Sequence, residues 1–220
     1  AARLAGALGA SVLLSDDGLH SRRLEADLAI AVVDGAHGAG NGLCPPAGPL
    51  RAPLAEQIAA VDAALVIGAG AAGDRVAALA HAAGRAAWRA VLRPDREIAR
   101  RLAGVPVLAF AGIGRPEKFF STLEETGARL VGRRAFADHH PYRTRDLREL
   151  RREARARGAV LVTTEKDAAR LPAETSDVSV LSVALCFAAE ESVAGALAQC
   201  LAGARLTREA CARAARFRSA

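Results

Sequence analysis

The sequence contains no methionine, one tryptophan, one tyrosine and four cysteines among its 220 residues. The cysteines form no C-x-x-C pair and have no histidine at zinc-ligand spacing, which excludes a structural zinc motif. No apolar run is long enough for a transmembrane helix, and no secretory signal pattern opens the chain. Aromatic residues amount to 4%, and no recognised nucleic-acid reader motif is present. We therefore expect reduced thiols and no nucleic-acid partner; the cysteines are Cys44, Cys186, Cys200 and Cys211.

Basic residues outnumber acidic ones, 30 against 24, giving a formal net charge of +6. This excess suits an anionic partner such as phosphate, nucleic acid or a membrane surface. Charge alone does not choose among them, and a solvated basic face is the alternative. The arginine-rich segment Thr144–Arg157 is interpreted as a solvent-facing helix, because Leu147 and Leu150 give it one apolar side.

Short apolar runs bounded by turn residues alternate with amphipathic segments along the chain. Continuous apolar runs of this length fit strands that are buried on both faces. The alternation predicts an α/β fold with a largely parallel sheet flanked by helices. The predicted strands are Val12–Leu14, Leu28–Val33, Ala63–Ile67, Val105–Ala111, Arg129–Val131, Ala159–Val162 and Val178–Val183. The predicted helices are Gly73–Gly84, Pro116–Thr126, Thr144–Arg157 and Glu190–Ala202.

The domain organisation is predicted from an interruption of this pattern near Arg93–Gly104, where Pro94 and several charges occur. We expect a nucleotide-binding core over 1–93, a second α/β part over 94–203, and a basic, loosely held tail over 204–220. The opening residues Ala2–Ala10 have the composition of a helix already under way. The chain is therefore expected to be a fragment of a longer protein.

Polar clusters follow several predicted strands, and ligands of open α/β sheets bind at the carboxyl ends of strands. Asp16-Asp17 follows the first apolar run. An acidic residue in this position holds Mg²⁺ in nucleotide-hydrolysing α/β proteins, because carboxylate oxygens suit a hard cation. An ordinary turn or helix cap is the alternative interpretation.

Two glycine-containing segments are candidate anion sites. Gly38–Gly42 allows close approach of a ligand to the backbone, although the chain contains no G-x-x-x-x-G-K-[ST] phosphate-binding loop. Arg51, a few residues later, is a candidate partner for phosphate. Gly112–Pro116 lies between a predicted strand and helix, where free N–H groups favour anions. Arg115 and Lys118 would add positive charge there; an ordinary turn is again the alternative.

The segment Asp138-His139-His140-Pro141 carries two imidazoles next to a carboxylate. A histidine with a pKa near neutrality can act as a general base, and a carboxylate can fix its tautomer. Metal ligation and an inert surface pair are the alternatives. In Thr163–Asp167, Thr164 is a predicted helix cap, and Lys166 is predicted either to reach a phosphate or to pair with a neighbouring acid.

The order and spacing of these motifs resemble those of the tetraacyldisaccharide 4′-kinase family, the lipid A 4′-kinases of Gram-negative bacteria. The resemblance covers Val12 to about Val183. It implies a fold like that of P-loop NTPases with a smaller lobe, and transfer of the γ-phosphate of ATP to the 4′-hydroxyl of tetraacyldisaccharide 1-phosphate to give lipid IVA. It also implies a peripheral position on the cytoplasmic face of the inner membrane. The motifs are Asp16–Leu19, Gly40–Gly42, Pro46–Arg51, Phe110–Pro116, Asp138–Tyr142 and Thr163–Asp167.

By this resemblance, Asp16 and Asp17 match the acids that hold Mg²⁺, and His139 matches the imidazole that works with an upstream Asp on the hydroxyl. That Asp, the P-loop and a membrane-binding helix precede Ala1 in the family pattern. The chain also departs from the pattern at Ala52, where Glu is usual, and at His20, where Gln is common.

The leading hypothesis from the sequence is phosphoryl transfer to a lipid-linked sugar, with ATP and Mg²⁺ as cofactors and an anionic membrane surface as a partner. His139 would accept the proton of the hydroxyl with Asp138 orienting it. The four basic residues Arg51, Arg115, Lys118 and Lys166 would contact phosphates. The alternative is a non-catalytic fragment or relic of that kinase without its P-loop. A dedicated protein partner is not evident.

Overall fold

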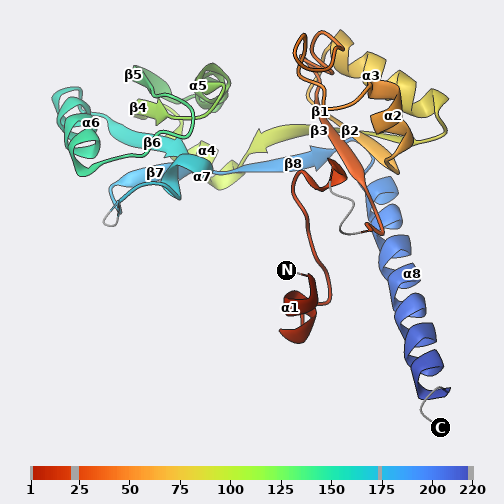
Figure 1. The fold of residues 1–220 in the computed structure, drawn as a ribbon. Helices are drawn as coiled ribbons and strands as arrows, with labels where there is room; N and C mark the ends of the chain where they lie inside the picture. Colours follow the sequence, from red (N-terminus) through yellow and green to blue (C-terminus); the bar gives the residue numbers. More distant parts are fainter. Residues whose placement is uncertain (1, 21–24, 173–174, 218–220) are drawn as a thin grey trace. The chain divides into compact units, whose positions relative to one another are not determined.

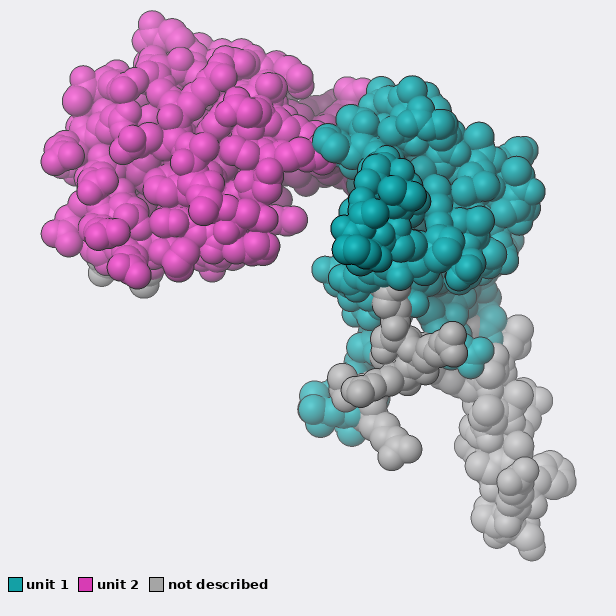
Figure 2. Space-filling model, turned by 45° about the horizontal axis from the view of Figure 1, so that its top comes forward, with its two compact units in different colours: residues 1–91, 187–220 teal, residues 92–186 magenta. Residues whose placement is uncertain are grey.

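The computed structural model describes residues 2–20, 25–172 and 175–217. It forms two compact units, one made of residues 1–91 and 187–220 and the other of residues 92–186 (Figure 2). Within the predicted basic tail, residues 218–220 lie outside the described residues, as do the side chains from residue 204 onward. Each unit has its own hydrophobic core.

One sheet has the strand order β1-β2-β3-β8 (Figure 1). The first unit contains β1, β2 and most of β3, and the boundary between the units falls within β3 and β8. Strand β2 pairs in parallel with both β1 and β3. Its residues are almost all buried because the short apolar run Ala63–Ile67 has a neighbour on either side. The elements of the first unit are α1 (Ala2–Ala7), a 3₁₀ turn (Gly18–His20), β1 (Ile30–Asp34), α2 (Leu54–Ala59), β2 (Ala63–Ile67), α3 (Ala71–Ala82) and α8 (Glu190–Phe217). The strands β3 (Ala86–Pro94) and β8 (Val183–Phe187) are shared with the second unit.

Helix α3 packs very closely on the end of β1. Its Gly73 donates its N–H to the carbonyl of Gly35 at 2.8 Å. A Cβ atom on Gly73 would lie 2.6 Å from the Cα atom of Gly35, so a side chain there would force the helix away from the strand. The core of the unit contains Ile58, Ala64, Val76 and Ala80.

The second unit has a four-stranded sheet in the order β5-β4-β6-β7, with every neighbouring pair parallel. Parallel neighbours need crossover connections, and helices α5 and α6 supply two of them. The elements are α4 (Arg96–Leu102), β4 (Pro106–Ala111), α5 (Pro116–Glu125), β5 (Arg129–Ala135), α6 (Thr144–Ala156), β6 (Val160–Thr164), α7 (Glu165–Ala168) and β7 (Val178–Leu181).

The central strand β4 separates two apolar clusters. Successive side chains of a strand point to opposite faces, so Val107, Ala109 and Ala111 join a cluster with Phe119 and other residues of α5. The intervening residues join a second cluster with Tyr142 and the apolar side of α6, and are Leu108 and Phe110. Both faces of β4 are therefore covered, as its unbroken apolar run predicted.

The predicted α/β class with a largely parallel sheet flanked by helices is confirmed, but the parallel strands divide between two sheets. The predicted strand Val12–Leu14 is wrong: these residues belong to no strand, and all three are exposed. Strand β3 was not predicted, because it buries only Trp88 and Ala90 and carries charges between and beyond them. Val12–Leu14 is a run of only three apolar residues, which is too short to define a strand without a pairing partner.

The chain passes between the units through β3 and β8, and residues 187–220 belong with the first unit. Within that unit, Ala188 donates its N–H to the carbonyl of Arg89 at 2.9 Å. Helix α8 continues to Phe217, beyond the predicted end at Ala202. Across the described part of the chain, helices that combine the length and apolarity needed to cross a bilayer are absent.

Candidate functional site

Polar segments follow three neighbouring strands of the second unit. Gly112–Arg115 follows β4, Phe136–Tyr142 follows β5, and α7 with Thr164 as its N-cap follows β6. Because β5, β4 and β6 are adjacent and parallel, their carboxyl ends lie at one edge of the sheet, where such folds bind ligands. The topology therefore brings together three of the segments that the sequence analysis selected.

Gly112 connects these segments through its backbone. Its N–H donates to Oδ1 of Asp167 at 3.1 Å. Its carbonyl accepts from the N–H of His139 at 3.0 Å and from Nη1 of Arg170 at 3.2 Å. A side chain could not replace the glycine hydrogen freely, because a Cβ atom there would lie 3.1 Å from the hydroxyl oxygen of Tyr142.

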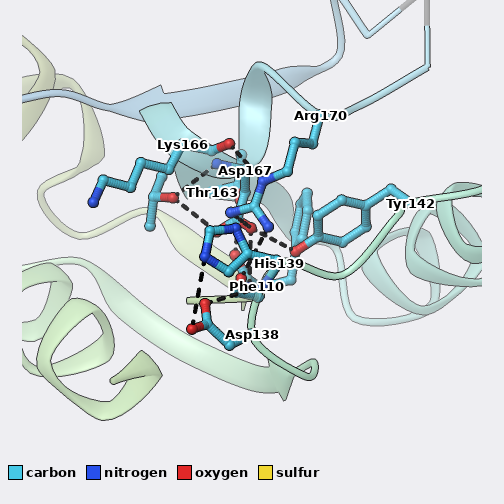
Figure 3. A network of polar contacts seen from close by, with 10 residues as sticks. Phe110, Asp138, His139, Tyr142, Thr163, Lys166, Asp167 and Arg170 are labelled. Atoms are coloured by element: carbon cyan, nitrogen blue, oxygen red, sulfur yellow. Dashed lines mark hydrogen bonds and ion pairs between the residues drawn. The ribbon is translucent and has the colours of Figure 1, made fainter. Parts of the chain in front are cut away.

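The two predicted catalytic side chains, Asp138 and His139, lie side by side at the protein surface (Figure 3). The His139 side chain is 86% exposed, and its Nε2 atom lies 3.9 Å from Oδ2 of Asp138. That separation is too long for a hydrogen bond. Asp138 instead accepts from the backbone N–H of His139 at 3.0 Å. The carboxylate thus contacts the turn that carries the imidazole and leaves the ring open to a reactant.

His139 has a φ angle of 58°, in the left-handed region that non-glycine residues seldom adopt. Its N–H donates to two acceptors, the carbonyl of Gly112 and Oδ1 of Asp138, and these bonds hold the backbone in this conformation. Left-handed residues of this kind persist only where the surroundings fix them. The position of the imidazole is therefore set by its neighbours rather than by a regular helix or strand.

The neighbouring histidine, His140, is a packing residue. Its ring lies against Phe136, with centroids 4.7 Å apart, and meets the ring of Tyr142 edge-on at 5.0 Å. Its Nε2 atom lies 3.2 Å from Oδ2 of Asp146. The sequence analysis considered the two histidines together. In the structure the His139 side chain is exposed, whereas the His140 ring packs against Phe136.

Asp146 fastens this segment to the start of α6. Its Oδ2 atom accepts from the N–H of Arg143 at 2.9 Å, as an acidic residue in the first turn of a helix commonly does. This backbone hydrogen bond, followed by the hydrogen bond with His140, holds the pKa of Asp146 below its usual value. The carboxylate is therefore more acidic in the folded protein than in the unfolded chain.

The substitution Asp146→Asn is expected to make the free energy of unfolding depend less on pH in the acid range. The folded pKa is depressed, so Asp146 stabilises the protein above its unfolded pKa, about 3.9. That contribution is lost as the pH falls through the folded pKa, because the unfolded chain then binds the extra proton. Urea unfolding from neutral to strongly acid pH measures the effect. The pKa of Asp177 is also lowered, by Arg151, so the free energy of unfolding of the variant should still fall somewhat at acid pH. Parallel plots of the free energy of unfolding against pH for variant and wild type would contradict the expectation.

The predicted phosphate-binding side chains of the second unit are exposed. Arg115 is the N-cap of α5, and Pro116 occupies the first turn, as predicted. Arg115 and Lys118 both lie at the surface. Lys166 extends away from the network around Asp167 (Figure 3). All three cations are placed where an external anion can reach them.

The predicted site residues of the first unit contact one another. Nη2 of Arg51 lies 2.8 Å from Oδ2 of Asp17, and both side chains are more than half exposed. Asp17 has a φ angle of 55°. Asp16 precedes it in the same exposed turn. The structure thus pairs a predicted phosphate ligand with a predicted metal ligand, while Asp138, His139, Arg115, Lys118 and Lys166 belong to the second unit.

The glycine-rich loop between β1 and α2 is closed on itself by Asn41. The Nδ2 group of Asn41 donates to the carbonyl of Ala47 at 2.7 Å, and its Oδ1 atom accepts from the N–H of Leu43 at 3.1 Å. These bonds fix the segment that leads to Arg51. Clusters of three or more His, Cys, Asp or Glu side chains able to hold a metal do not occur within the described ranges.

The sequence profile described as LpxK, tetraacyldisaccharide-1-P 4′-kinase, matches residues 1–202. The chain belongs to this family. A tetraacyldisaccharide 4′-kinase of Bradyrhizobium sp. is 56% identical over 168 residues, which are 76% of this chain and 49% of that protein. Another from Xanthobacter autotrophicus is 55% identical over 175 residues, 77% of this chain and 51% of that protein. The chain therefore spans about half the length of the curated tetraacyldisaccharide 4′-kinases that it matches.

A solved structure also resembles this member of the tetraacyldisaccharide 4′-kinase family. It is an "apo" form of LpxK from Aquifex aeolicus, crystallised in complex with ATP. The TM-score is 0.56 at 19% identity, over 84% of this chain and 56% of that one. At this identity the likeness concerns the fold, which agrees with the α/β architecture described above.

Sequence reasoning did not assign a role to Asp167, Tyr142 or Arg170. Asp167 was part of a selected motif, but its lysine neighbour received the functional role. A usable signal was present, since Thr164 caps α7 and places Asp167 in the first helical turn, pointing back toward the sheet. Its contact with Gly112, 55 residues earlier in the chain, is visible only in the folded protein.

Proposed function

We propose that the protein transfers the γ-phosphate of ATP to the 4′-hydroxyl of tetraacyldisaccharide 1-phosphate, giving lipid IVA in lipid A biosynthesis. The observation that carries the proposal is the exposed imidazole of His139, held beside Asp138 at the carboxyl edge of a parallel sheet. It occurs in a chain of the tetraacyldisaccharide 4′-kinase family. The protein would thus be a lipid-sugar kinase.

In this proposal His139 acts as the general base. As the 4′-oxygen attacks the γ-phosphorus, the imidazole accepts the hydroxyl proton, and the bond from the γ-phosphorus to the β–γ bridging oxygen breaks to release ADP. Such transfers depend mainly on positioning and on neutralising charge. Arg115, Lys118 and Lys166 are proposed to contact phosphate groups, and Asp138 to orient the turn that carries His139.

The donor set of the first unit fits a magnesium–nucleotide group. Mg²⁺ prefers carboxylate oxygens and usually takes only one or two from the protein, together with phosphates and water. Asp16 and Asp17 supply two such carboxylates, and Arg51 lies against the second of them. When bound, the cation would offset the charge of the nucleotide phosphates. Arg51 is proposed to contact those phosphates bidentately.

We also propose that the protein associates peripherally with an anionic lipid surface, on the cytoplasmic face of the inner membrane. The net charge of +6 supports this proposal, since each basic residue near such a surface contributes about 1 kcal/mol. The acyl chains of the proposed substrate would make the membrane the place where acceptor and enzyme meet.

A transfer assay tests the kinase proposal. The protein that carries these residues is incubated with γ-labelled ATP, Mg²⁺ and tetraacyldisaccharide 1-phosphate in mixed micelles, and the lipid fraction is separated. Label in a product one phosphate larger is expected. Absence of labelled lipid at every ATP concentration, together with no measurable ATP binding, would overturn the proposal in favour of a non-catalytic relic.

A further inference from the structure

Asp167 is a buried carboxylate to which the mechanism above gives no role. Its side chain is fully buried, and an ionised group in such a place must be paired and hydrogen-bonded. Oδ1 accepts from the hydroxyl of Tyr142 at 3.0 Å and lies 3.2 Å from Nη2 of Arg170. Oδ2 accepts from the hydroxyl of Thr164 at 2.7 Å. With the N–H of Gly112, four donors meet one carboxylate.

These donors come from three separate segments at the edge of the sheet (Figure 3). Gly112 lies in the loop after β4, Tyr142 ends the segment after β5, and Thr164 and Arg170 flank α7 after β6. The segments that carry Gly112 and Tyr142 are irregular, so no ladder of backbone hydrogen bonds fixes them, whereas Thr164 ends β6 and caps α7. The carboxylate joins all three at one point.

Gly112 passes this constraint directly to His139. The N–H of Gly112 is bonded to Asp167, and its carbonyl accepts from both Arg170 and the N–H of His139. Only two hydrogen bonds and the backbone of a single residue, Gly112, therefore separate the buried carboxylate from the backbone of His139. Tyr142, two residues beyond His140, holds the other end of the same turn.

The phenol of Tyr142 is a permanent donor in this arrangement. Burial raises its pKa far above the usual value, and the nearby charge of Asp167 and the hydrogen bond to it act in the same direction. The hydroxyl therefore keeps its proton at any physiological pH. Tyr142 also packs edge-on against Phe110 with centroids 5.6 Å apart, which holds the phenol ring in place beside Asp167.

We infer that Asp167, bonded to Gly112, Tyr142 and Arg170, is a positioning residue that holds the left-handed turn of His139 in the geometry needed for proton transfer. The part of this inference that concerns proton transfer rests on the proposed function. The physical reason is that the φ angle of His139, 58°, is unfavourable for a non-glycine residue and requires an external constraint. Asp167 supplies it through Gly112.

The test uses two shape-preserving variants and one matched control. Asp167→Asn keeps the size of the side chain and removes its charge; Tyr142→Phe removes one donor. Thr163→Val is the control, because Thr163 is equally buried and donates to the carbonyl of Phe110 at 2.8 Å, yet contacts neither Gly112 nor His139 in the bonds described above. Turnover, KM for ATP and amide hydrogen exchange at Gly112 and His139 are measured for each.

The expected result is a fall in kcat of about 10- to 100-fold for Asp167→Asn and Tyr142→Phe, as small misplacements of a reacting group produce, with KM for ATP little changed. Exchange at Gly112 and His139 accelerates in both variants and not in Thr163→Val, which keeps wild-type kcat. If all three variants lose kcat in proportion to their loss of stability, the positioning role is overturned. If the wild-type protein has no turnover, the proposed function fails separately; selective exchange then still supports the constraint, and unchanged exchange overturns it.

Discussion

Replacing His139 by asparagine is expected to lower kcat by about 10²- to 10⁴-fold, the usual contribution of a general base. Asparagine tolerates the left-handed conformation that His139 adopts, so the turn survives, whereas alanine would add backbone strain. The side chain is 86% exposed, and its removal leaves no cavity. Stability and ATP affinity should therefore remain close to those of the wild-type protein.

The adjacent residue provides a control for this experiment. His140→Asn removes a ring that packs against Phe136 and Tyr142 and contacts Asp146. This change is expected to lower the free energy of unfolding by about 1–3 kcal/mol, as loss of buried packing does. Its effect on kcat should be much smaller than that of His139→Asn. Unchanged turnover in His139→Asn would exclude the imidazole from the chemistry.

The substitution Phe110→Ala is expected to destabilise the second unit by about 3–5 kcal/mol, the cost of deleting a large buried aromatic side chain. Phe110 is fully buried on the central strand β4. Its ring meets Phe136 at 6.5 Å and Tyr142 at 5.6 Å, both edge-on. Removing it empties the space between the sheet and α6 and leaves Tyr142 without a support.

The single tryptophan and the single tyrosine make this prediction measurable unit by unit. Trp88 belongs to the first unit and Tyr142 to the second, so their fluorescence during urea unfolding reports the two units separately. Phe110→Ala should shift the tyrosine transition and leave the tryptophan transition nearly unchanged. Val160→Ala, at a half-exposed position of β6 in the second unit, is the control with a small expected cost. Equal shifts for the two variants would contradict the expected role of Phe110.

Local sequence signals predicted several elements well because their physical causes are local. The apolar runs at Ala63–Ile67 and Val105–Ala111 became strands buried on both faces. Pro116 opens α5 and Thr164 caps α7, as their chemistry at helix starts predicts. Family membership was also available from the spacing of short motifs, and the sequence profile confirmed it over residues 1–202.

Long-range pairing decided what local signals could not. The apolar residues of strand β3 are interrupted by Arg89 and Arg93, and the segment becomes a strand because β2 and β8 lie beside it. Val12–Leu14 is an uninterrupted apolar run, yet it belongs to no strand. The return of residues 187–220 to the first unit also depends on contacts with residues far earlier in the chain, such as that between Ala188 and Arg89. Such pairings join residues that are far apart in the sequence, so they cannot be predicted from a short segment alone.

The sequence by itself determined the family, the α/β class and the identity of the exposed polar motifs. Only the tertiary structure separated His139 from His140, because the difference lies in which ring the aromatic side chains cover. The tertiary structure also showed that Asp167 is buried and accepts hydrogen bonds from several segments of the chain. The physical reason is that burial of a charge requires donors from several segments at once, and Gly112, Tyr142 and Arg170 meet Asp167 only after the parallel strands have aligned their ends.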